Sequence, residues 1–409
     1  MNTILILTLA FVRTPYLQNL TDSTVVVCWQ SATAECGRVE YGSTSKYGLS
    51  VCDSIPTIDH ALTLVGLERD EEYYYWVVSG ADTSKSAWFH APVSPGRPFW
   101  FFVVGDNHSS DTLRHKSVVE EMVRHIPRPT VLLNAGDLTN HGTDQEYRRY
   151  LEIEHELLSR VPVLPALGNH DRGNTSNWRR FFALPNNERW YSFRCGSSAF
   201  HAVSSYDGRT PGSVQYNWLL NELLADSAAG MRHIFVWMHD IVWSTSQGAP
   251  DNVAKTYLCP LFERFGVEIV FCGHVHAYEH SLVNGVHYIT TGGGGDSAVL
   301  PPDGWDAWQP WTVYREGTWE CVRVDVEDDM VRSVGIRPDG SQFDTLCLYG
   351  GGISEPRQPL SAPGLRSAGA VQVYDATGRL VRGAPPPGVY FRRTGLRTTR
   401  ELIRSKDLW

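Results

Sequence analysis

The residue types with the clearest chemical potential follow five apolar runs in the middle of the chain. Each run ends in side chains that bind metals through oxygen or imidazole nitrogen, and four of the five have a glycine just before the first polar residue. One such loop would be ordinary, but five in series are not expected by chance. The candidates are Asp106 and His108 in GDNH, Asp137 in GDLTN, Asn169, His170 and Asp171 in GNHD, His239 in MHD, and His274 and His276 in GHVH.

The donor types predict a site for two metal ions. Two aspartates, one asparagine and four histidines are oxygen and nitrogen donors, and seven are too many for one tetrahedral zinc. They suit two ions that share a bridging carboxylate and keep open positions. Such ions lie about 3.5–4 Å apart and clamp the attacking and leaving oxygens of an in-line displacement. The seven candidate ligands are Asp106, His108, Asp137, Asn169, His239, His274 and His276.

Alternating strands and helices must position these donors. The apolar runs alternate with stretches of helical character at 112–125, 144–159, 215–227 and 256–266. Strands that alternate with helices predict a mainly parallel sheet covered on both faces. Ligands in such sheets bind beyond the carboxyl ends of the strands, so we expect all the candidate groups at one edge of one sheet.

The flanking segments have a different character. Residues 13–97 hold short runs rich in Val, Tyr and Trp, which predict an all-β sandwich, and SPGRP at 94–98 marks its end. Residues 98–349 form the expected catalytic domain, 350–370 a Gly/Pro/Ser-rich linker, and 371–409 a small β segment. Residues 1–12 are apolar and favour the remnant of a signal peptide, with a short strand as the alternative.

Bulk properties exclude some classes of protein. The formal net charge is −9 and no long basic run is present, which argues against nucleic acid as a structural partner. No apolar stretch reaches the roughly 18 residues of a membrane helix. The eight cysteines include no C-x-x-C pair and are expected to be free, buried thiols, with disulfides among Cys28, Cys36 and Cys52 or between Cys321 and Cys347 as the alternative. His60, His115 and His155 are expected at the surface. The oligomeric state stays open.

The order D-x-H, G-D, G-N-H-D, a single His and G-H-x-H resembles that of calcineurin-like metallophosphoesterases. The resemblance covers roughly residues 98–345 and is closest to the purple acid phosphatase-like branch, as in CGHVHAYEH. RTPYLQNLTDSTVVVCWQ resembles the amino-terminal fibronectin type III-like domain of that branch. The fold implied is α/β, a metallophosphoesterase βαβ sandwich, with an N-terminal all-β sandwich domain and a small C-terminal β segment.

The resemblance also implies roles for the candidate residues. One ion would take Asp106, His108, Asp137 and His276, and the other Asp137, Asn169, His239 and His274. A hydroxide between the ions would attack the phosphorus of a small phosphate ester. His170 would protonate the leaving oxygen or stabilise phosphoryl charge, and Asp171 would orient it. The two ions would be Fe, Zn or Mn in some combination, and monoester and diester substrates remain alternatives.

Two positions depart from the purple members of the family. Asn140 stands where those members have a tyrosine, and His108 stands where they have no ligand. A histidine therefore replaces the tyrosinate, which implies a non-purple relative. His280 stands in place of the arginine that follows AYE. His141, Asp240, Trp243 and Tyr278 are further candidates for the substrate cleft.

The C-terminal segment resembles a type IX secretion sorting domain in VQVYDATGRLV and PPPGVYFRR. That resemblance implies a secreted or cell-surface protein, with the periplasm as a further location, and an accessory β module is the alternative. A catalytically silent binding or adhesion protein of the same fold is the competing function. Such a protein should have lost ligands, and none of the seven is missing.

Overall fold

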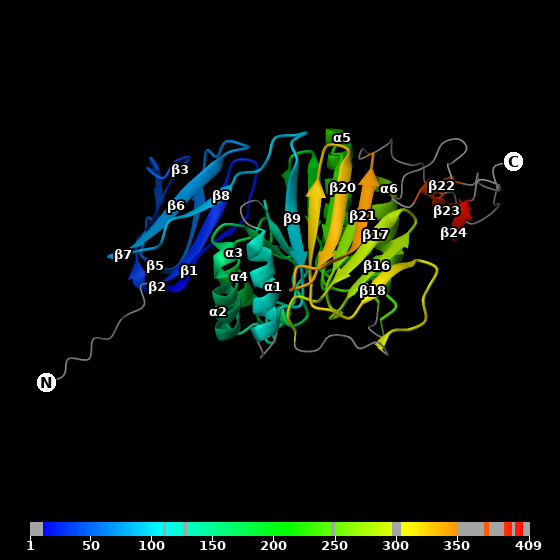
Figure 1. The fold of residues 1–409 in the computed structure, drawn as a ribbon. Coiled ribbons are helices and arrows are strands. Elements are labelled where there is room, and N and C mark those ends of the chain that lie inside the picture. Colours follow the sequence, from blue (N-terminus) through cyan, green and yellow to red (C-terminus); the bar gives the residue numbers. More distant parts are fainter. Residues whose placement is uncertain are drawn as a thin grey trace.

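Two large sheets dominate the computed structural model (Figure 1). It describes residues 11–108, 112–125, 129–246, 250–296 and 304–350, and the backbone of 372–375, 388–394 and 397–403. Most of the expected signal-peptide remnant and of the expected linker therefore lies outside the described residues. None of the described helices is long and apolar enough to span a membrane.

The first sheet has nine strands in the described part of the chain, in the order β21-β20-β19-β9-β10-β11-β1-β2-β5. Its centre is parallel, because β9, β10 and β11 run in the same direction. The strands are β9 (Phe99–Val104), β10 (Leu132–Asn134), β11 (Val163–Pro165), β19 (Cys321–Val326), β20 (Met330–Ile336), β21 (Gln342–Tyr349), β1 (Phe11–Gln18), β2 (Val25–Glu35) and β5 (Thr57–Leu64).

The second sheet has seven described strands, in the order β12-β13-β14-β15-β17-β16-β18. Strands β13, β14, β15 and β17 are parallel to one another. The strands are β12 (Tyr191–Cys195), β13 (Ser198–Ala202), β14 (His233–Trp237), β15 (Ile269–Cys272), β16 (Tyr278–Val283), β17 (Val286–Thr291) and β18 (Thr312–Glu316).

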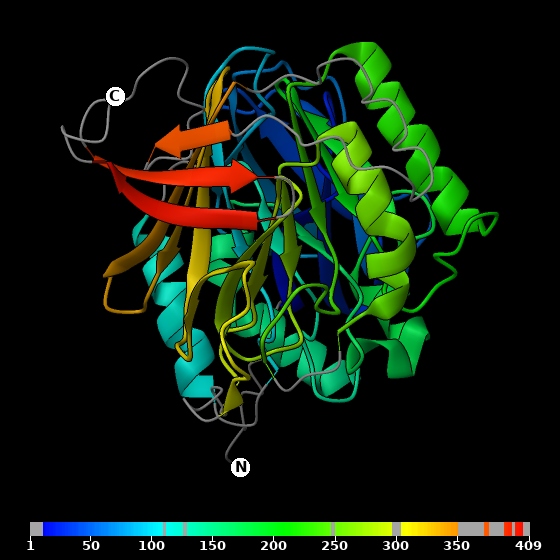
Figure 2. The same cartoon turned by 90° about the vertical axis from the view of Figure 1, so that its right-hand side faces the viewer.

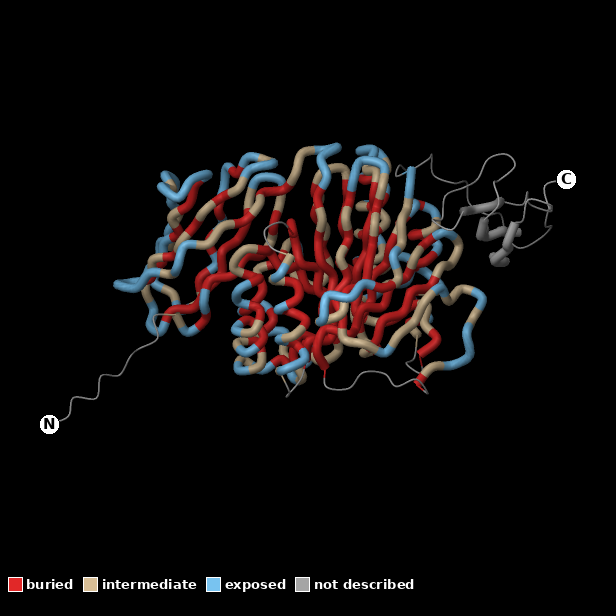
Figure 3. The backbone as a smooth tube through the Cα atoms, in the orientation of Figure 1, coloured by how far each residue is buried: buried red, intermediate tan, exposed pale blue. Residues whose placement is uncertain are grey.

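Side-chain alternation explains why the two sheets pack face to face. Successive side chains of a strand point to opposite faces. Phe101 of the first sheet lies 5.2 and 5.3 Å, between ring centroids, from Phe200 and Phe235 of the second. Ile234 and Val236, on the other face of β14, belong instead to a core cluster with the helices α5 (Val214–Ala229) and α6 (Cys259–Phe265). The continuous apolar runs are therefore buried on both faces, as the buried strands in Figure 3 show.

Helices cover the outer faces of the sheets (Figure 2). On the side of β9–β11 lie α1 (Thr112–Arg124), α2 (Asp144–Ile153), α3 (His155–Leu158), the 3₁₀ turn η1 (Asp171–Asn174) and α4 (Thr175–Phe181). On the opposite side lie α5 (Val214–Ala229), the π-helical turn η2 (Ala254–Leu258) and α6 (Cys259–Phe265). A capping box of Thr143 and Glu146 begins α2, and glycines with left-handed backbone end α5 and α6.

One parallel sheet with helices on both faces was expected, and the number of sheets is wrong. Two sheets pack at the centre with helices outside each, which gives four layers: helices, sheet, sheet and helices. A strand packed between a sheet and a helix is as apolar as one packed between two helices, so the sequence pattern is the same. The expected helix 144–159 is divided at Glu154, whose carboxylate lies 2.8 Å from Nε2 of the buried His115.

The N-terminal region forms the expected β-sandwich, but one of its layers continues the first sheet. Strand β1 pairs with β11 through Gln18 and Val163. The Tyr16 hydroxyl donates to the Phe181 carbonyl at 2.5 Å, and the Tyr75 hydroxyl donates to the Ser159 carbonyl at 2.8 Å. The other layer comprises β3 (Gly37–Gly42), β4 (Leu49–Cys52), β6 (Glu72–Ser79), β7 (Asp82–Thr83) and β8 (Ala87–His90). Its fibronectin type III character stays a prediction.

The C-terminal segment contains a separate antiparallel sheet of β22 (Gln372–Asp375), β23 (Gly388–Thr394) and β24 (Arg397–Ile403). Its type IX sorting role stays a prediction.

Several buried polar groups differ from expectation. His60 is buried against Trp29 and lies 2.5 Å from Asp53, and His115 is buried beside Glu154, so only His155 of the three is exposed. In both cases a carboxylate partner offsets the free-energy cost of burying the polar imidazole. All eight cysteines are free, as predicted, but Cys36 and Cys52 are exposed.

Candidate metal centre

The candidate donors meet where the carboxyl ends of the strands of both sheets converge. Asp106, Asp137 and Asn169 follow β9, β10 and β11 of the first sheet, whereas His239 and His274 follow β14 and β15 of the second. Potential ligand atoms form three groups, and within each group these atoms all lie within 4.8 Å of one another. The groups are Asp106, His108 and His276; His108, Asp137 and His170; and Asp137, His239 and His274. The second group shares a residue with each of the others, so the three form one continuous cluster.

The backbone of these loops is strained at three donors. Asp106, Asp137 and His274 have φ angles of 59°, 56° and 69°, in the left-handed region that non-glycine residues rarely adopt. Such conformations persist where surrounding structure enforces them and are concentrated at functional sites. Gly168 lies against Asp137, where a Cβ would come within 2.2 Å of the Asp137 backbone nitrogen, so glycine is required there.

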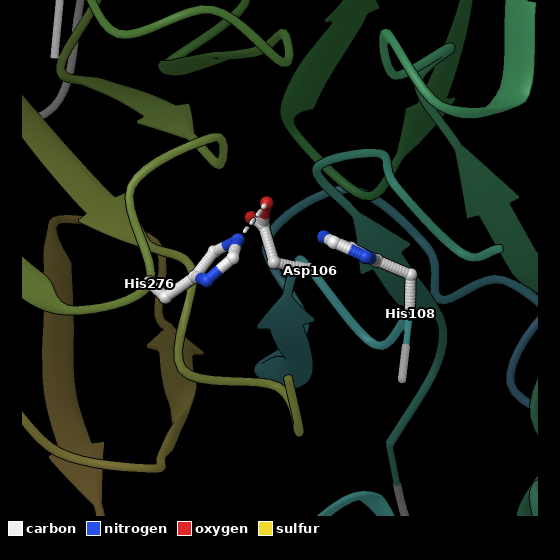
Figure 4. A group of neighbouring side chains, drawn as sticks. All are labelled: Asp106, His108 and His276. Carbon is white, nitrogen blue, oxygen red and sulfur yellow. Dashed lines mark ion pairs between the residues drawn. The ribbon is translucent and has the colours of Figure 1, made fainter. Parts of the chain in front are cut away.

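Each aspartate has one oxygen bound by the backbone and one directed at imidazoles. Oδ2 of Asp106 accepts the His274 N–H at 2.8 Å, and Oδ1 faces Nε2 of His276 at 3.7 Å (Figure 4). Oδ1 of Asp137 accepts the His170 N–H at 2.9 Å. Its Oδ2 faces Nε2 of His239 at 3.1 Å, of His108 at 3.8 Å and of His170 at 3.9 Å. This oxygen is therefore the meeting point of both sides of the cluster.

The remaining donors face the same space. The Asn169 side-chain oxygen lies 3.0 Å from Nε2 of His239 and 3.0 Å from Nδ1 of His274. Nδ1 of His239 lies 2.8 Å from the Ala135 carbonyl oxygen, which can only accept. Nδ1 of His239 must then carry the hydrogen, and Nε2 is available as a ligand when the ring is neutral.

The electrostatics of the cluster favour the binding of a cation. Burial raises the pKa of Asp106 to about 7, although His239 and His276 oppose the shift. Burial also acts to raise the pKa of Asp137, but its imidazole neighbours outweigh this and lower it to about 2. His239 responds in the opposite sense: burial lowers its pKa, and Asp137 more than compensates, raising it to about 10. Without a cation, a proton on His239 balances the buried carboxylates.

Within the described part of the chain, two buried donor atoms have no hydrogen-bond partner. These atoms are Oδ1 of Asp106 and Nε2 of His108, both in the first group. Buried polar atoms normally have a partner, so an orphaned oxygen and an orphaned nitrogen that face one space need an explanation. A metal ion coordinated by both atoms provides one, and the oxygen and nitrogen donor set suits Zn, Fe or Mn.

His170 lies at the rim of the cluster, and its side chain is 40% exposed. Its ring stacks on His108, with 4.4 Å between centroids. Nδ1 of His170 lies 2.7 Å from the Asn140 carbonyl oxygen, and the Asn140 side-chain oxygen lies 3.0 Å from Nδ1 of His108. Asn140 thus contacts both imidazoles, a role that sequence reasoning missed because it treated this position only as a lost tyrosine.

Asp171 is directed away from His170. Its buried carboxylate accepts hydrogen bonds from the Leu138 and Gly168 N–H groups and from the Thr139 and Tyr147 hydroxyls. Burial raises its pKa to about 6. The structure therefore places the Asn140 carbonyl, and not Asp171, at the His170 ring, and Asp171 stabilises the loops that carry Asp137 and Asn169.

The four candidates for the substrate cleft are dispersed. Tyr278 is buried, and its hydroxyl donates to Asp344, so it does not line a cleft. His280, the residue in the arginine position, is also buried and contacts Asp344. Asp240 is closer to the donors: it accepts from the Tyr206 hydroxyl at 2.7 Å, and the Tyr206 and His239 rings are 6.5 Å apart.

The contacts of Trp243 and His141 are with residues other than the candidate metal donors. Lys255 lies over the Trp243 ring at 4.4 Å from its centroid. The His141 side chain is 78% exposed and lies beside Glu146 at 3.0 Å. Neither contact links these residues to the metal ligands.

A sixth loop joins the site and was not recognised in the sequence. It follows β17, which is parallel to β15, and it reads GGGGD, ending in Asp296. The signal was present: glycine and then aspartate after an apolar strand, as in GDNH and GDLTN.

Comparisons with known proteins agree with this geometry. Residues 99–278 match the family model described as calcineurin-like phosphoesterase. The chain is 24% identical over 317 residues to purple acid phosphatase 1 of Ipomoea batatas, covering 66% of this chain and 65% of that protein. It is 25% identical over 306 residues to Fe(3+)-Zn(2+) purple acid phosphatase 12 of Arabidopsis thaliana, covering 64% of each. The chain thus spans slightly less than two thirds of these relatives.

The fold has a counterpart among solved structures. It superposes on purple acid phosphatase PPD1 from yellow lupin (Lupinus luteus) with a TM-score of 0.72 and 18% identity, covering 82% of this chain and 74% of that one. The predicted metallophosphoesterase fold is thereby confirmed. The family match confirms the predicted class of the domain over residues 99–278, that of a calcineurin-like phosphoesterase domain.

Proposed function

We propose that this chain, with its calcineurin-like phosphoesterase domain, is a dinuclear-metal phosphoesterase that hydrolyses small phosphate esters. One observation carries the proposal: Oδ2 of Asp137 faces imidazole nitrogens of His108 and His239, which belong to different groups of ligand atoms. A carboxylate in that position is placed to join two ions. All seven donor residues are retained, which argues against a catalytically silent binding protein.

The contacts support a division of ligands between two ions. The first would be held by Asp106, His108, Asp137 and His276, and the second by Asp137, Asn169, His239 and His274. When bound, such a pair supplies an activated water-derived nucleophile and neutralises charge on the phosphoryl oxygens. The name of the Arabidopsis relative makes an Fe–Zn pair one candidate, beside Zn and Mn pairs.

His170 is proposed as the general acid or charge stabiliser at the leaving oxygen. Its Nδ1 donates to the Asn140 carbonyl, so only Nε2 can face a substrate. In the protonated ring Nε2 carries a hydrogen that can pass to the leaving oxygen as the ester bond breaks. The exposure of the ring leaves room for a substrate beside it.

Location and substrate complete the proposal. The relatives named above are phosphatases, which favours monoesters, and diester or nucleotide hydrolysis by the same site is the alternative. The sorting-like tail supports a secreted or cell-surface protein.

The test is reconstitution of metal-free protein with Zn²⁺, Mn²⁺ or Fe, followed by turnover of an aryl phosphate and of a bis-aryl phosphate. We expect two ions per chain and activity that depends on both. Tight binding of two ions without turnover of any ester would favour the silent binding protein. Failure to bind two ions would overturn the assignment of the site.

A further inference from the structure

Asp296 contacts the histidines assigned to the first ion from the side opposite to the other ligands. Its Oδ1 lies 3.2 Å from Nδ1 of His276, and its Oδ2 lies 3.4 Å from Nδ1 of His108. Asp296 is itself largely buried, with 9% of its surface exposed. One carboxylate thus reaches the outer nitrogens of two imidazoles that come from different loops.

The loop that carries Asp296 is bound to the loops of the ligands. The Asp296 N–H donates to the Asp106 carbonyl at 3.1 Å, and the Gly294 N–H donates to the Gly105 carbonyl at 2.9 Å. The Gly292 backbone packs so closely on Val275 that a Cβ would lie 2.0 Å from the Val275 carbonyl oxygen. The position of Asp296 is therefore set by the same backbone that positions Asp106 and His276.

The inner nitrogens of the two rings face the aspartates. Nε2 of His276 lies 3.7 Å from Asp106, and Nε2 of His108 lies 3.8 Å from Asp137. A neutral imidazole binds a metal through its unprotonated nitrogen, and the hydrogen bond of the other nitrogen decides which one that is. An acceptor at Nδ1 leaves Nε2 free for the ion.

We infer that Asp296 is a positioning residue for the first metal ion: its carboxylate accepts hydrogen bonds from Nδ1 of both His108 and His276 and holds both rings with Nε2 unprotonated. The inference rests on the proposed function, since it concerns the same site. Asp296 does not coordinate the ion and does not touch substrate. It fixes the orientation and the tautomer of His276, and it supports those of His108 together with Asn140.

The chemistry requires a carboxylate and not an amide. Nδ1 of His276 donates to the group between the rings, and Nδ1 of His108 shares its hydrogen between that group at 3.4 Å and the Asn140 side-chain oxygen at 3.0 Å. A carboxylate offers an accepting oxygen to each ring, whereas an amide offers only one. In Asp296→Asn one ring would face an NH₂ group, whichever way the amide lies. His108 retains a second acceptor in the Asn140 side chain at 3.0 Å, so His276 should be the more sensitive ligand.

The experiment measures Zn²⁺ affinity of metal-free full-length protein by competition with a chromophoric chelator. We expect Asp296→Asn to weaken one of the two sites roughly 10- to 100-fold and to leave the other unchanged. Glu320→Gln is the matched control, because Glu320 is a buried acid near Asp106 that bonds to Thr291 and Gly293 and to no imidazole. It should keep both affinities.

A variant with a weakened second metal site identifies which ion Asp296→Asn affects. Asn169→Ala should weaken the second site and keep the first. Adding Asp296→Asn should then weaken the remaining site too. If the double variant binds its remaining ion as tightly as Asn169→Ala does, Asp296 does not serve the first ion and the inference is overturned.

A direct readout of the tautomer separates positioning from general destabilisation. In zinc-loaded protein labelled with ¹⁵N-histidine, we expect two rings protonated at Nδ1 and coordinated through Nε2 to change their signals in Asp296→Asn, with no loss of thermal stability in the metal-free form. Unchanged ring signals together with unchanged affinity would overturn the inference. Should Asp296→Asn fail to fold, Asp296→Ser removes both acceptors with a smaller side chain and is read in the same way.

Failure of the proposed function can be distinguished from failure of the inference about Asp296. If wild-type protein does not bind two ions, the site assignment is wrong. If it binds two ions and turns over esters while Asp296→Asn has wild-type affinities, only the inference about Asp296 is wrong.

Discussion

At the scale of residues, the proposed metal ligands differ in burial from His170, the residue proposed to face the substrate. The Asp137 carboxylate is 2% exposed and is surrounded by three imidazoles, whereas the His170 ring is 40% exposed and bonds to a backbone carbonyl. Nε2 of His170 lies 3.9 Å from Oδ2 of Asp137, so the metal content of a His170 variant distinguishes a further ligand from a group that faces substrate.

Substitution of Asp137 and of His170 should have different consequences. Asp137→Ala removes a charge that both ions need, so metal content and activity should fall together. His170→Ala should keep both ions and lose on the order of 10²–10⁴ in turnover, the usual range for a positioned general acid. Metal stoichiometry is measured beside turnover of two esters whose leaving groups differ widely in pKa.

The two esters refine the role of His170. The loss should be smaller for the ester with the better leaving group, because its departing oxygen needs no proton. Equal losses would mean that His170 stabilises phosphoryl charge or positions the substrate. Loss of metal in His170→Ala would instead make it a ligand.

Asn140 should prevent the colour of tyrosinate-bound iron. Its side-chain oxygen lies 3.0 Å from Nδ1 of His108, and His108 is the ligand proposed to replace the tyrosinate. Iron-loaded protein should therefore show no strong visible band of tyrosinate-to-iron charge transfer. Asn140→Tyr alone should not create that band while His108 is present. Absorption spectra of both iron-loaded proteins test this, and a purple wild-type preparation would refute the ligand set of the first ion.

At the scale of elements, the loop after β17 brings a second acid close to the site. Glu320 is fully buried beneath this loop, where it accepts hydrogen bonds from the Thr291 hydroxyl and the Gly293 N–H. Burial raises its pKa to about 8, although both hydrogen bonds oppose the shift. Glu320 is therefore protonated in the folded metal-free protein at neutral pH.

This pKa predicts how the stability of metal-free protein depends on pH. Because the folded pKa lies above the unfolded value of about 4.3, the contribution of Glu320 is complete below the unfolded value and is lost as pH rises toward 8. The free energy of unfolding should fall by up to about 1.4 kcal/mol per pH unit in this window. Glu320→Gln cannot ionise, so its slope between pH 5 and 8 should be shallower in denaturant titrations. Equal slopes in the two proteins would show that Glu320 is ionised when folded.

At the scale of the whole molecule, the two flanking regions relate differently to the catalytic domain. Strand β1 extends the first sheet, and Arg13 lies over the Phe181 ring at 4.6 Å from its centroid. The described C-terminal strands pair only among themselves. All the proposed ligands lie between residues 106 and 276.

Truncation should therefore be tolerated at one end only. A chain that ends at residue 350 should keep its metal content and its turnover within about twofold, because it loses no ligand. Removal of residues 11–97 should lower the melting temperature, because it exposes the β11 edge and leaves the carbonyls of Phe181 and Ser159 without their tyrosine donors. Calorimetry and metal analysis of both truncated proteins test this. Loss of activity with retained metal in the first would show that the tail does more than direct the protein.

The sequence by itself determined which residues could bind metal and where along the chain they lie. Apolar runs that end in glycine and a donor, such as VVGDNH and FCGHVH, indicate strands with ligands at their carboxyl ends, because burial and sharp turning need those residue types locally. The family match bears out the class of domain drawn from these motifs. The helices expected over 112–125, 215–227 and 256–266 also followed, because helical periodicity is a local property, whereas the stretch 144–159 is divided and α4 was not expected.

Only the tertiary structure decided how these pieces meet. It placed His239 and His274 on a different sheet from Asp106 and Asp137. The sequence could not show this, because a strand buried by a second sheet has the same composition as one buried by helices. It directed Asp171 away from His170 and brought Asn140 to that ring. It also brought Asp296 to two histidines that lie 188 and 20 residues before it, since a hydrogen bond between distant loops leaves no periodic trace in the chain.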